Sequence, residues 1–366
     1  MNRISKWHDN YIIGKPSKGC KLCSQGAKMV LFITGECDSS CFYCPIMKEK
    51  RMNITFANEQ QIDSIEEAIQ EARMISALGV GITGGDPSLK LEKVTEYISE
   101  LKKEFGPKFH CHLYTSHALT KEELKQLFKA GLDEIRFHPP SLILTKDIQE
   151  TIKNAKEFDW DVGIEIPVIP DKQEGILQII NFSIKLKLDF VNLNEFEITE
   201  ANVELLDNLG YSSKAATSAA VMGSEILALQ LLKEYKKSPI TIHYCSARYK
   251  DGVQLRNRLI RRAKNYAKDF DEITSEGLLV RGRIVIKDGV LLTPILSELK
   301  TCYGITSESI EIEEDNNIIY IHWKTAKKIT DFLLEHYLDK ISSIEIIHQY
   351  PYRNGIITYL EPLYEP

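Results

Sequence analysis

Five of the eight cysteines lie close together near the N-terminus, and their spacing is typical of a metal or cluster site. In a small secreted protein, such a group would predict a disulfide framework. This chain has 366 residues, and its first residues lack the apolar core of a signal peptide. We therefore expect a cytoplasmic protein. Because disulfides are rare in that compartment, we expect these cysteines to bind a metal ion or cluster.

Three of these cysteines form a C-x3-C-x2-C motif, which consists of Cys37, Cys41 and Cys44 in the stretch FITGECDSSCFYCP. A [4Fe–4S] cluster usually takes four thiolates, so a loop that supplies three leaves one iron open to an outside ligand. A tetrahedral zinc ion would need a fourth protein ligand nearby. Residues 45–50 contain neither Cys nor His, so the motif favours a cluster with an open iron.

This motif, with Tyr43 before its last cysteine and the apolar run 29–33 ahead of it, resembles the radical S-adenosylmethionine (SAM) enzymes. The resemblance covers roughly residues 27–245 and is closest to the subgroup related to pyruvate formate-lyase activating enzyme. It implies that Cys37, Cys41 and Cys44 hold a [4Fe–4S] cluster whose open iron binds SAM. It also implies that an electron from a donor such as ferredoxin or flavodoxin cleaves SAM to a 5′-deoxyadenosyl radical, which abstracts hydrogen from the substrate. Tyr43 matches the aromatic residue that usually lies against the adenine.

A second motif, Gly84-Gly85-Asp86-Pro87, follows the next predicted strand. By the same resemblance, it corresponds to the GGEP element that receives the amino group of the methionine moiety of SAM. Asp86 stands where Glu is commoner, and two glycines let the backbone approach a ligand closely. Without the cysteine motif, this tetrapeptide would indicate only a turn.

Polar residues at the ends of later predicted strands are further candidates for contact with SAM or substrate. We select Ser116, Glu165 and Asn194, and the same strand ends also carry Thr115, Glu134, Arg136 and Asn192. The alternative is that such residues only cap the next helix. Glu165 lies in the otherwise apolar segment 163–167, where an unpaired carboxylate would be costly, so we favour a ligand contact there.

The remaining pair, Cys20 and Cys23, forms a C-x2-C motif that cannot complete a tetrahedral site alone. Cys245 is the best third ligand, and the possible fourth ligands are Cys302, Cys111 and His243. We hypothesise an auxiliary site that holds a second [4Fe–4S] cluster or a zinc ion. The alternative is that Cys245 and Cys111 are buried small hydrophobic residues.

An alternation of predicted strands and helices must position these residues. Short apolar segments predict seven strands, at 29–34, 79–83, 109–115, 133–138, 162–169, 190–193 and 240–244. Amphipathic segments between them predict helices, the last over 215–236. We predict an α/β fold, a partial or near-complete (β/α) barrel of the radical SAM type, with its chemistry at the C-terminal ends of the strands. An open doubly wound sheet is the alternative.

The sequence changes character after Cys245. A basic helical segment, 248–268, precedes four predicted antiparallel strands, at 278–286, 318–323, 344–348 and 355–360, and a helix near 326–337. We therefore expect three parts: an N-terminal extension with the C-x2-C motif over 1–26, the barrel over 27–245, and a smaller C-terminal α+β domain with the basic helix over 246–366.

The basic segment has eight Lys and Arg residues and two Asp residues between positions 248 and 269, although the whole chain has a net charge of −6. Helical spacing places Arg258, Arg261 and Arg262 on one face. Arginine binds phosphate in a bidentate manner, so these residues suit an anionic substrate such as RNA, a nucleotide or a phosphorylated metabolite. The alternative is a solvated helix face.

Composition limits the remaining possibilities. The chain is 43% apolar and 27% charged, as in globular proteins. No apolar run approaches the ~18 residues of a membrane-spanning helix, so we expect no membrane association. The leading hypothesis is a radical SAM enzyme that modifies a macromolecule, either RNA or protein. The alternatives are the same chemistry on a small anionic metabolite, or a non-catalytic zinc-binding module.

Overall fold

The structure, a computed structural model, describes residues 4–313, 316–352 and 355–365. The chain forms two compact units that divide between Leu255 and Arg256, whereas the predicted boundary lay between residues 245 and 246. Each unit has its own hydrophobic core.

Seven parallel strands form the centre of the first unit. They pair in chain order: β3 (Lys28–Thr34), β6 (Gly79–Gly84), β7 (His110–Thr115), β8 (Glu134–Phe137), β9 (Asp161–Val168), β10 (Phe190–Glu195) and β11 (Thr241–Cys245). The seven predicted strands are thus confirmed. A doubly wound sheet would reverse its strand order part-way, and this sheet does not. The fold is a partial barrel.

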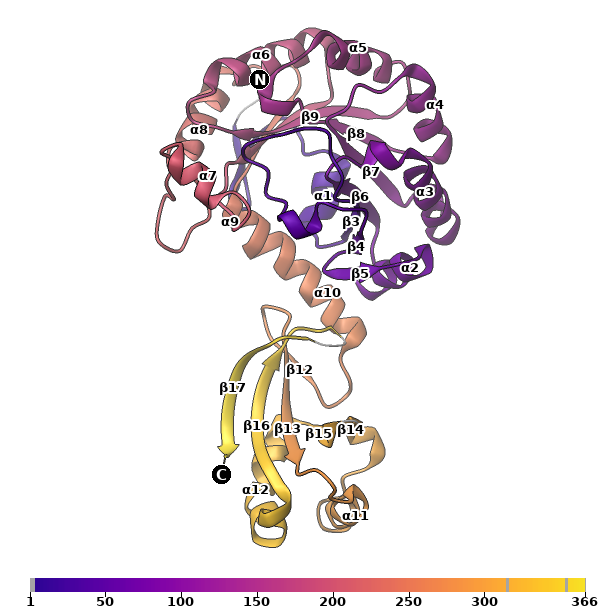
Figure 1. The fold of residues 1–366 in the computed structure, drawn as a ribbon, viewed down its shortest axis with the longest axis vertical. Coiled ribbons are helices and arrows are strands. Elements are labelled where there is room, and N and C mark those ends of the chain that lie inside the picture. Colours follow the sequence, from indigo (N-terminus) through magenta and orange to yellow (C-terminus); the bar gives the residue numbers. More distant parts are fainter. Residues whose placement is uncertain (1–3, 314–315, 353–354, 366) are drawn as a thin grey trace. The chain divides into compact units, whose positions relative to one another are not determined.

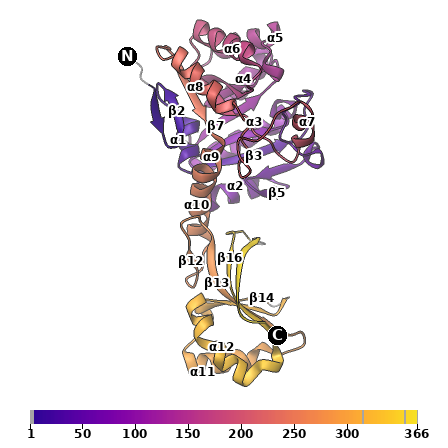
Figure 2. The same ribbon diagram turned by 90° about the vertical axis from the view of Figure 1, so that its left-hand side faces the viewer.

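Two antiparallel hairpins, which the local sequence pattern did not predict, cover the edges of this sheet. The hairpin of β1 (Ser5–Trp7) and β2 (Asn10–Ile13) pairs with β11 (Figure 2). The hairpin of β4 (Thr55–Ala57) and β5 (Gln60–Ile62) pairs with β3. Because each edge binds a hairpin, β3 and β11 do not pair with each other and the barrel stays open.

Helices lie outside the strands of the first unit (Figure 1). They are α2 (Ile65–Met74), α3 (Leu91–Phe105), α4 (Lys121–Ala130), α5 (Lys146–Ala155), α6 (Gln173–Leu186), α7 (Val203–Asn208) and α8 (Ser224–Glu234). The helix predicted over 215–236 is wrong in its first half. Ser213 bridges to Val221, and Gly223 has a φ of +87°, so α8 starts only at Ser224.

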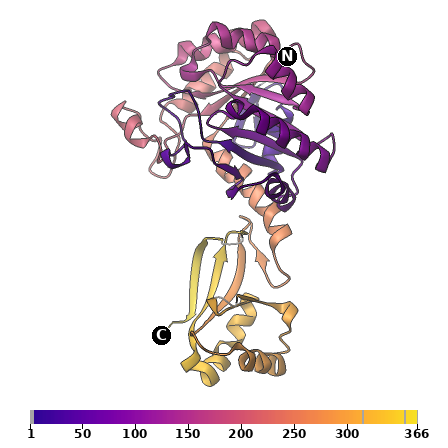
Figure 3. The ribbon, with the colours of Figure 1, turned by 45° about the vertical axis from the view of Figure 1, so that its right-hand side comes forward.

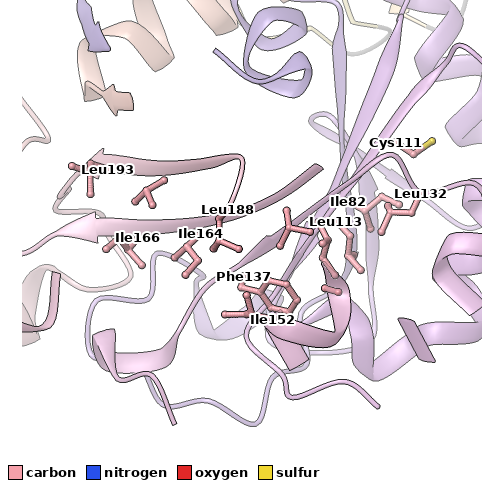
Figure 4. Packing of buried hydrophobic residues seen from close by; sticks show 14 of the residues in the cluster. Ile82, Cys111, Leu113, Leu132, Phe137, Ile152, Ile164, Ile166, Leu188 and Leu193 are labelled. Atoms are coloured by element: carbon pink, nitrogen blue, oxygen red, sulfur yellow. The ribbon is translucent and has the colours of Figure 1, made fainter. Parts of the chain in front are cut away.

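The two faces of the parallel sheet differ in polarity. Alternate residues of a strand point to opposite faces. On β9, Val162, Ile164 and Ile166 pack in the apolar core with residues of the outer helices (Figure 4). Glu165 and Pro167, from the alternate positions, line a cavity on the inner face. The outer face therefore holds the core, and the inner face carries the polar residues.

A short helix, α1 (Lys18–Ser24), lies against the inner face of the strands (Figure 1). A Cβ atom on Gly19 would lie 2.6 Å from Nη2 of Arg136 and 2.8 Å from Nδ1 of His112. The helix contacts β6 and β7 as well as β3. The N-terminal extension therefore contributes to the interior of the barrel.

The second unit begins with α10 (Arg256–Tyr266) and contains an antiparallel sheet. Its strands are β12 (Glu272–Ile273), β13 (Leu279–Ile286), β14 (Ile310–Glu313), β15 (Ile318–Ile321), β16 (Ile341–Gln349) and β17 (Ile357–Tyr364). The helices α11 (Leu292–Tyr303), which was not predicted, and α12 (Trp323–Tyr337) share a core with this sheet (Figure 3). In the described part of the chain, no helix has the length and apolar character needed to span a membrane.

Candidate functional site

A cavity of about 990 Å³ lies at the carboxyl ends of the parallel strands, in the first unit. Its walls come from the loop after β3 and from the ends of β6, β7, β9 and β10. The predicted site residues that line it are Cys37, Cys41, Tyr43, Cys44, Gly84, Gly85, Pro87, Ser116, Glu165 and Asn194. Side chains far apart in the sequence therefore meet where the barrel prediction placed the chemistry.

The loop with Cys37, Cys41 and Cys44, here called the cysteine loop (residues 35–46), presents its thiols at this cavity. Cys37 is exposed, and the other two are half-buried. The amide of Ser39 donates to Sγ of Cys37 at 3.3 Å, and partial burial raises the pKa of the Cys37 thiol. Three thiols on one loop beside an open cavity suit a cluster with a free iron. No three His, Cys, Asp or Glu side chains of the described residues are arranged to hold a metal ion here, so ligation requires side-chain rotation.

Tyr43 fixes the cysteine loop to neighbouring segments. Its hydroxyl lies 3.0 Å from Nε2 of His138 and accepts a hydrogen bond from the amide of Ser141 at 3.2 Å. The side chain of Asn202 donates to its carbonyl oxygen at 3.2 Å. Burial raises the pKa of the Tyr43 hydroxyl, so this group stays neutral.

The two glycines of the turn Gly84–Pro87 lie against the start of the cysteine loop. Gly84 has a φ of +151°, and a Cβ atom there would lie 2.2 Å from the carbonyl oxygen of Thr34. A Cβ atom on Gly85 would lie 2.2 Å from the carbonyl oxygen of Glu36. A side chain at either position would therefore push the turn away from the loop.

Asp86 lies within this turn, but it does not line the cavity. Its carboxylate is fully buried and accepts hydrogen bonds from the amide and hydroxyl of Ser88, at 3.0 and 2.6 Å. It also accepts from the hydroxyl of Thr115 at 3.2 Å and from the amide and hydroxyl of Ser116 at 2.7 and 2.6 Å. Asp86 therefore joins the end of β6 to the end of β7 and positions Ser116 at the cavity wall.

Glu165 belongs to a buried polar network centred on Arg136, which is 2% exposed. Nη1 of Arg136 donates to Oε2 of Glu165 at 2.6 Å, and Nε donates to Oε1 of Glu134 at 2.6 Å. Asn192 and Asn194 also donate to Glu165, at 2.8 and 2.9 Å. Burial alone would raise the pKa of Glu165, but Arg136 and the two amides lower it to about 2.

Arg136 is predicted from the sequence at a strand end, with no partner assigned to it. The sequence signal that could have identified the partner is the alternation of side chains along a strand, in which every second residue points to the same face. By this alternation, one face of three neighbouring strands carries residues 134 and 136, 163 and 165, and 192 and 194. That alternation identifies Arg136 as the cation that compensates the buried carboxylate of Glu165.

The second cysteine group lines a smaller cavity of about 70 Å³ on the same inner face. Cys20, Cys23 and Cys245 meet there, together with His243. Burial opposes ionisation of Cys20, but Arg136 and His243 outweigh it and lower the thiol pKa to about 6. Of the other predicted fourth ligands, Cys111 packs in the outer core and Cys302 is exposed on α11.

The three arginines selected from the basic segment, Arg258, Arg261 and Arg262, do not share one solvent-facing surface. Arg262 is buried in the second unit, where its Nε donates to the carbonyl oxygen of Pro351 at 2.7 Å. Its guanidinium also lies 4.2 Å from the ring centroid of Tyr352. Arg258 and Arg261 are half-buried on α10. Arg262 therefore contributes to the packing of the second unit.

Comparison with known proteins agrees with this arrangement. Residues 31–142 match the radical SAM superfamily. A protein of Methanocaldococcus jannaschii, provisionally named a glycyl-radical enzyme activating enzyme, is 40% identical over 336 residues, which are 89% of this chain and 85% of the relative.

Solved structures resemble parts of the chain. Streptococcus suis SuiB bound to its precursor peptide SuiA has a TM-score of 0.44 at 15% identity, and the match covers 71% of this chain and 61% of SuiB. Methylornithine synthase (PylB) has a TM-score of 0.41 at 13% identity, over 62% of this chain and 72% of that enzyme. Likenesses this distant say nothing about the substrate.

Proposed function

This protein is a member of the radical SAM superfamily, in the group related to pyruvate formate-lyase activating enzyme, and from this premise we propose that it generates a radical on a glycyl residue of another protein. The observation that carries the proposal is the cavity at the strand ends, whose wall combines three loop thiols, a glycine turn and an ionised carboxylate. The M. jannaschii relative is named for activation of a glycyl-radical enzyme, which favours a protein substrate.

The cysteine loop would hold the cofactor. Cys37, Cys41 and Cys44 supply three thiolates on one wall of the cavity, a donor set that suits a [4Fe–4S] cluster with one open iron. When bound, the cluster and SAM would supply one-electron cleavage of the sulfonium, and with it the radical chemistry that removes a hydrogen atom from the substrate. We assign the supply of that electron to a donor such as ferredoxin or flavodoxin.

The other wall residues would bind and orient SAM. Gly84, Gly85 and Pro87 line the cavity, and Ser116 is held beside it by Asp86. Glu165 is ionised at neutral pH because its pKa is about 2, so it can accept hydrogen bonds from ribose hydroxyls or an ammonium group. Asn194 donates to Glu165 and lines the same wall. Tyr43 would place its ring near the adenine while its hydroxyl holds the loop.

Other functions have less support. Membership of an enzyme superfamily excludes the non-catalytic zinc module. RNA binding through a basic helix face is weakened because Arg262 is buried and hydrogen-bonded to Pro351. A small anionic metabolite remains the second candidate, because Lys250 lines the cavity. Its ammonium group is paired with Glu197, so it offers limited charge to a ligand.

The test is production of 5′-deoxyadenosine by the full-length chain after anaerobic reconstitution with iron and sulfide and reduction with dithionite. We expect product from the wild type and none above background from the Cys37→Ala/Cys41→Ala/Cys44→Ala variant, which lacks the cluster thiols. Absence of product from a chain with a confirmed cluster would contradict the proposal.

The substrate class needs a separate assay. A candidate glycyl-radical protein from the same organism should acquire an organic radical, detected by electron paramagnetic resonance, that is lost when its acceptor glycine becomes alanine. RNA binding that weakens with salt and is lost in Arg258→Ala/Arg261→Ala would instead favour an RNA substrate.

A further inference from the structure

The smaller cavity is lined by two pairs of side chains that can bind metals. The two pairs lie near the beginning and the end of the first unit in the sequence. Cys20 and Cys23 come from α1, and His243 and Cys245 come from β11. Residues three apart on a helix share a face, and residues two apart on a strand share a side. Each pair is therefore directed to one place by its own secondary structure.

Strand pairing brings the two pairs together. Strand β2 pairs with β11 through Ile12 opposite His243 and Tyr11 opposite Tyr244. The chain then runs from β2 into α1, which lies on the inner face of the sheet. The hairpin thereby carries the C-x2-C motif to the strand that bears Cys245, more than two hundred residues later in the chain.

His243 indicates a missing ligand at this cavity. Its side chain is 2% exposed, and among the described residues its ring nitrogens have no hydrogen-bond partner besides the neighbouring Cys20 thiol. The ring is held from one side by Trp7, whose centroid lies 5.4 Å away in an edge-on arrangement. Buried polar atoms are rarely left unpaired, and a metal ion is one partner that would satisfy an imidazole nitrogen.

The surroundings of the sulfur atoms suit thiolates. Sγ of Cys20 accepts hydrogen bonds from Nδ2 of Asn192 at 3.4 Å and from Nη2 of Arg136 at 3.6 Å. Nε2 of Gln254 lies 3.9 Å from Sγ of Cys245 and donates to it. N–H donors directed at sulfur are the outer contacts that orient and stabilise metal-bound thiolates.

We propose that Cys20, Cys23, His243 and Cys245 bind a single zinc ion, at a site separate from the cysteine loop. Three cysteines and one histidine form a standard tetrahedral zinc set. Four such side chains line this cavity of about 70 Å³, which is enough to complete the coordination of a single ion. The four side chains must rotate toward a common point, since no such group of the described residues is formed in this structure.

A zinc ion with four protein ligands has no open position, so its role is structural. It would join α1 to the end of β11 and hold both beside Glu165 and Asn194, which line the smaller and the larger cavity alike. The zinc site would thereby stabilise the wall that the smaller cavity shares with the proposed SAM site.

The test uses the full-length Cys37→Ala/Cys41→Ala/Cys44→Ala chain, so that no metal can bind at the cysteine loop. The chain is stripped with a chelator, loaded with zinc, dialysed and analysed for metal content. We expect about one zinc per chain, which Cys20→Ser and Cys245→Ser each abolish. Cys302→Ser is the matched control, because that thiol is exposed in the second unit, and it should leave the zinc content unchanged. Far-UV circular dichroism verifies that each variant is folded.

X-ray absorption at the zinc edge gives a second measurement that needs no further variant. The expected spectrum shows three sulfur ligands near 2.3 Å and one nitrogen near 2.0 Å. Folded protein that retains no zinc, or zinc that persists in Cys20→Ser and Cys245→Ser, overturns the proposal. Iron and sulfide in place of zinc after anaerobic reconstitution of the triple variant also overturn it. None of these results depends on SAM cleavage, so the proposed function is tested independently.

Discussion

The two cysteine groups of the first unit have the same kind of donor but opposite environments. In the cysteine loop, Cys37 is exposed, and its sulfur receives one backbone hydrogen bond at the edge of a cavity of about 990 Å³. On α1 and β11, Cys20 and Cys245 are each 7% exposed around a cavity of about 70 Å³. An open site allows a small molecule to reach the metal, whereas a closed site holds its metal with protein ligands alone. Cys23, like Cys41 and Cys44, is half-buried, so the contrast lies in the exposure of Cys37, the burial of Cys20 and Cys245, and the size of the adjoining cavity.

A shared wall connects the two environments. Tyr114, Glu165, Asn194 and Lys250 line both cavities. Arg136 contacts Glu165 on this wall and Cys20 in the second cysteine group. We call that second group, on α1 and β11, the closed group, and the cysteine loop the open group. The closed group should thus depend strongly on Arg136, and the open group should depend on it only indirectly.

The largest expected effect is on stability. Arg136→Leu leaves the buried carboxylates of Glu134 and Glu165 without their cation, so the free energy of unfolding should fall by about 3–5 kcal/mol. Urea unfolding followed by tryptophan fluorescence measures it, in a Trp323→Phe background so that only Trp7 and Trp160 of the first unit report. The control is Arg73→Leu, whose side chain is 58% exposed in a surface pair with Glu104 and should cost at most about 1 kcal/mol. Equal losses of unfolding free energy in the two variants would contradict the prediction, because the buried network around Arg136 would then stabilise the first unit no more than a surface ion pair does.

A smaller effect concerns the shared wall and depends on pH. Folding lowers the pKa of Glu165 from 4.5 to about 2, so its ionised form stabilises the folded state above pH 4.5. This contribution, on the order of 3 kcal/mol, is lost as the pH falls from about 4.5 to about 2. The stability advantage of the wild type over Glu165→Gln should therefore shrink across that range in acid-dependent urea unfolding. An advantage that is the same at pH 6 and pH 3 would contradict the assignment of Arg136 and the two amides as partners of the carboxylate.

The smallest effect concerns the open group. Tyr43→Phe removes the hydroxyl that contacts His138 and Ser141, so the free energy of unfolding should fall by about 1 kcal/mol. Iron content after reconstitution should stay at the wild-type value, because the three loop thiols remain. Tyr359→Phe, at an exposed position of the second unit, serves as the control. If Tyr43→Phe lowered the free energy of unfolding as much as Arg136→Leu does, the contacts of the cysteine loop would contribute as much stability as the buried network around Arg136.

Local patterns were enough to predict the seven parallel strands and most helices of the first unit. The helix α4, for example, begins at a capping box of Thr120 and Glu123 and ends at Gly131, and both signals involve only residues three or four apart. The helix start at Ser224 was missed, because residues 215–223 have helical composition but are held by the bridge between Ser213 and Val221. The hairpins β1–β2 and β4–β5 were missed because short edge strands have too few residues for a clear period.

The family, the alternation of strands and helices, and the cysteine loop with its glycine turn could all be predicted from the sequence, because they depend on the type and spacing of neighbouring residues. The directions of individual polar side chains emerged only from the folded chain. Asp86 turns inward to Ser88, Thr115 and Ser116, and Arg262 packs against Pro351. The meeting of Cys20 and Cys23 with Cys245 likewise depends on the pairing of β2 with β11. A buried polar group takes whichever partner lies nearest in space, and that partner comes from a distant segment that local spacing does not identify.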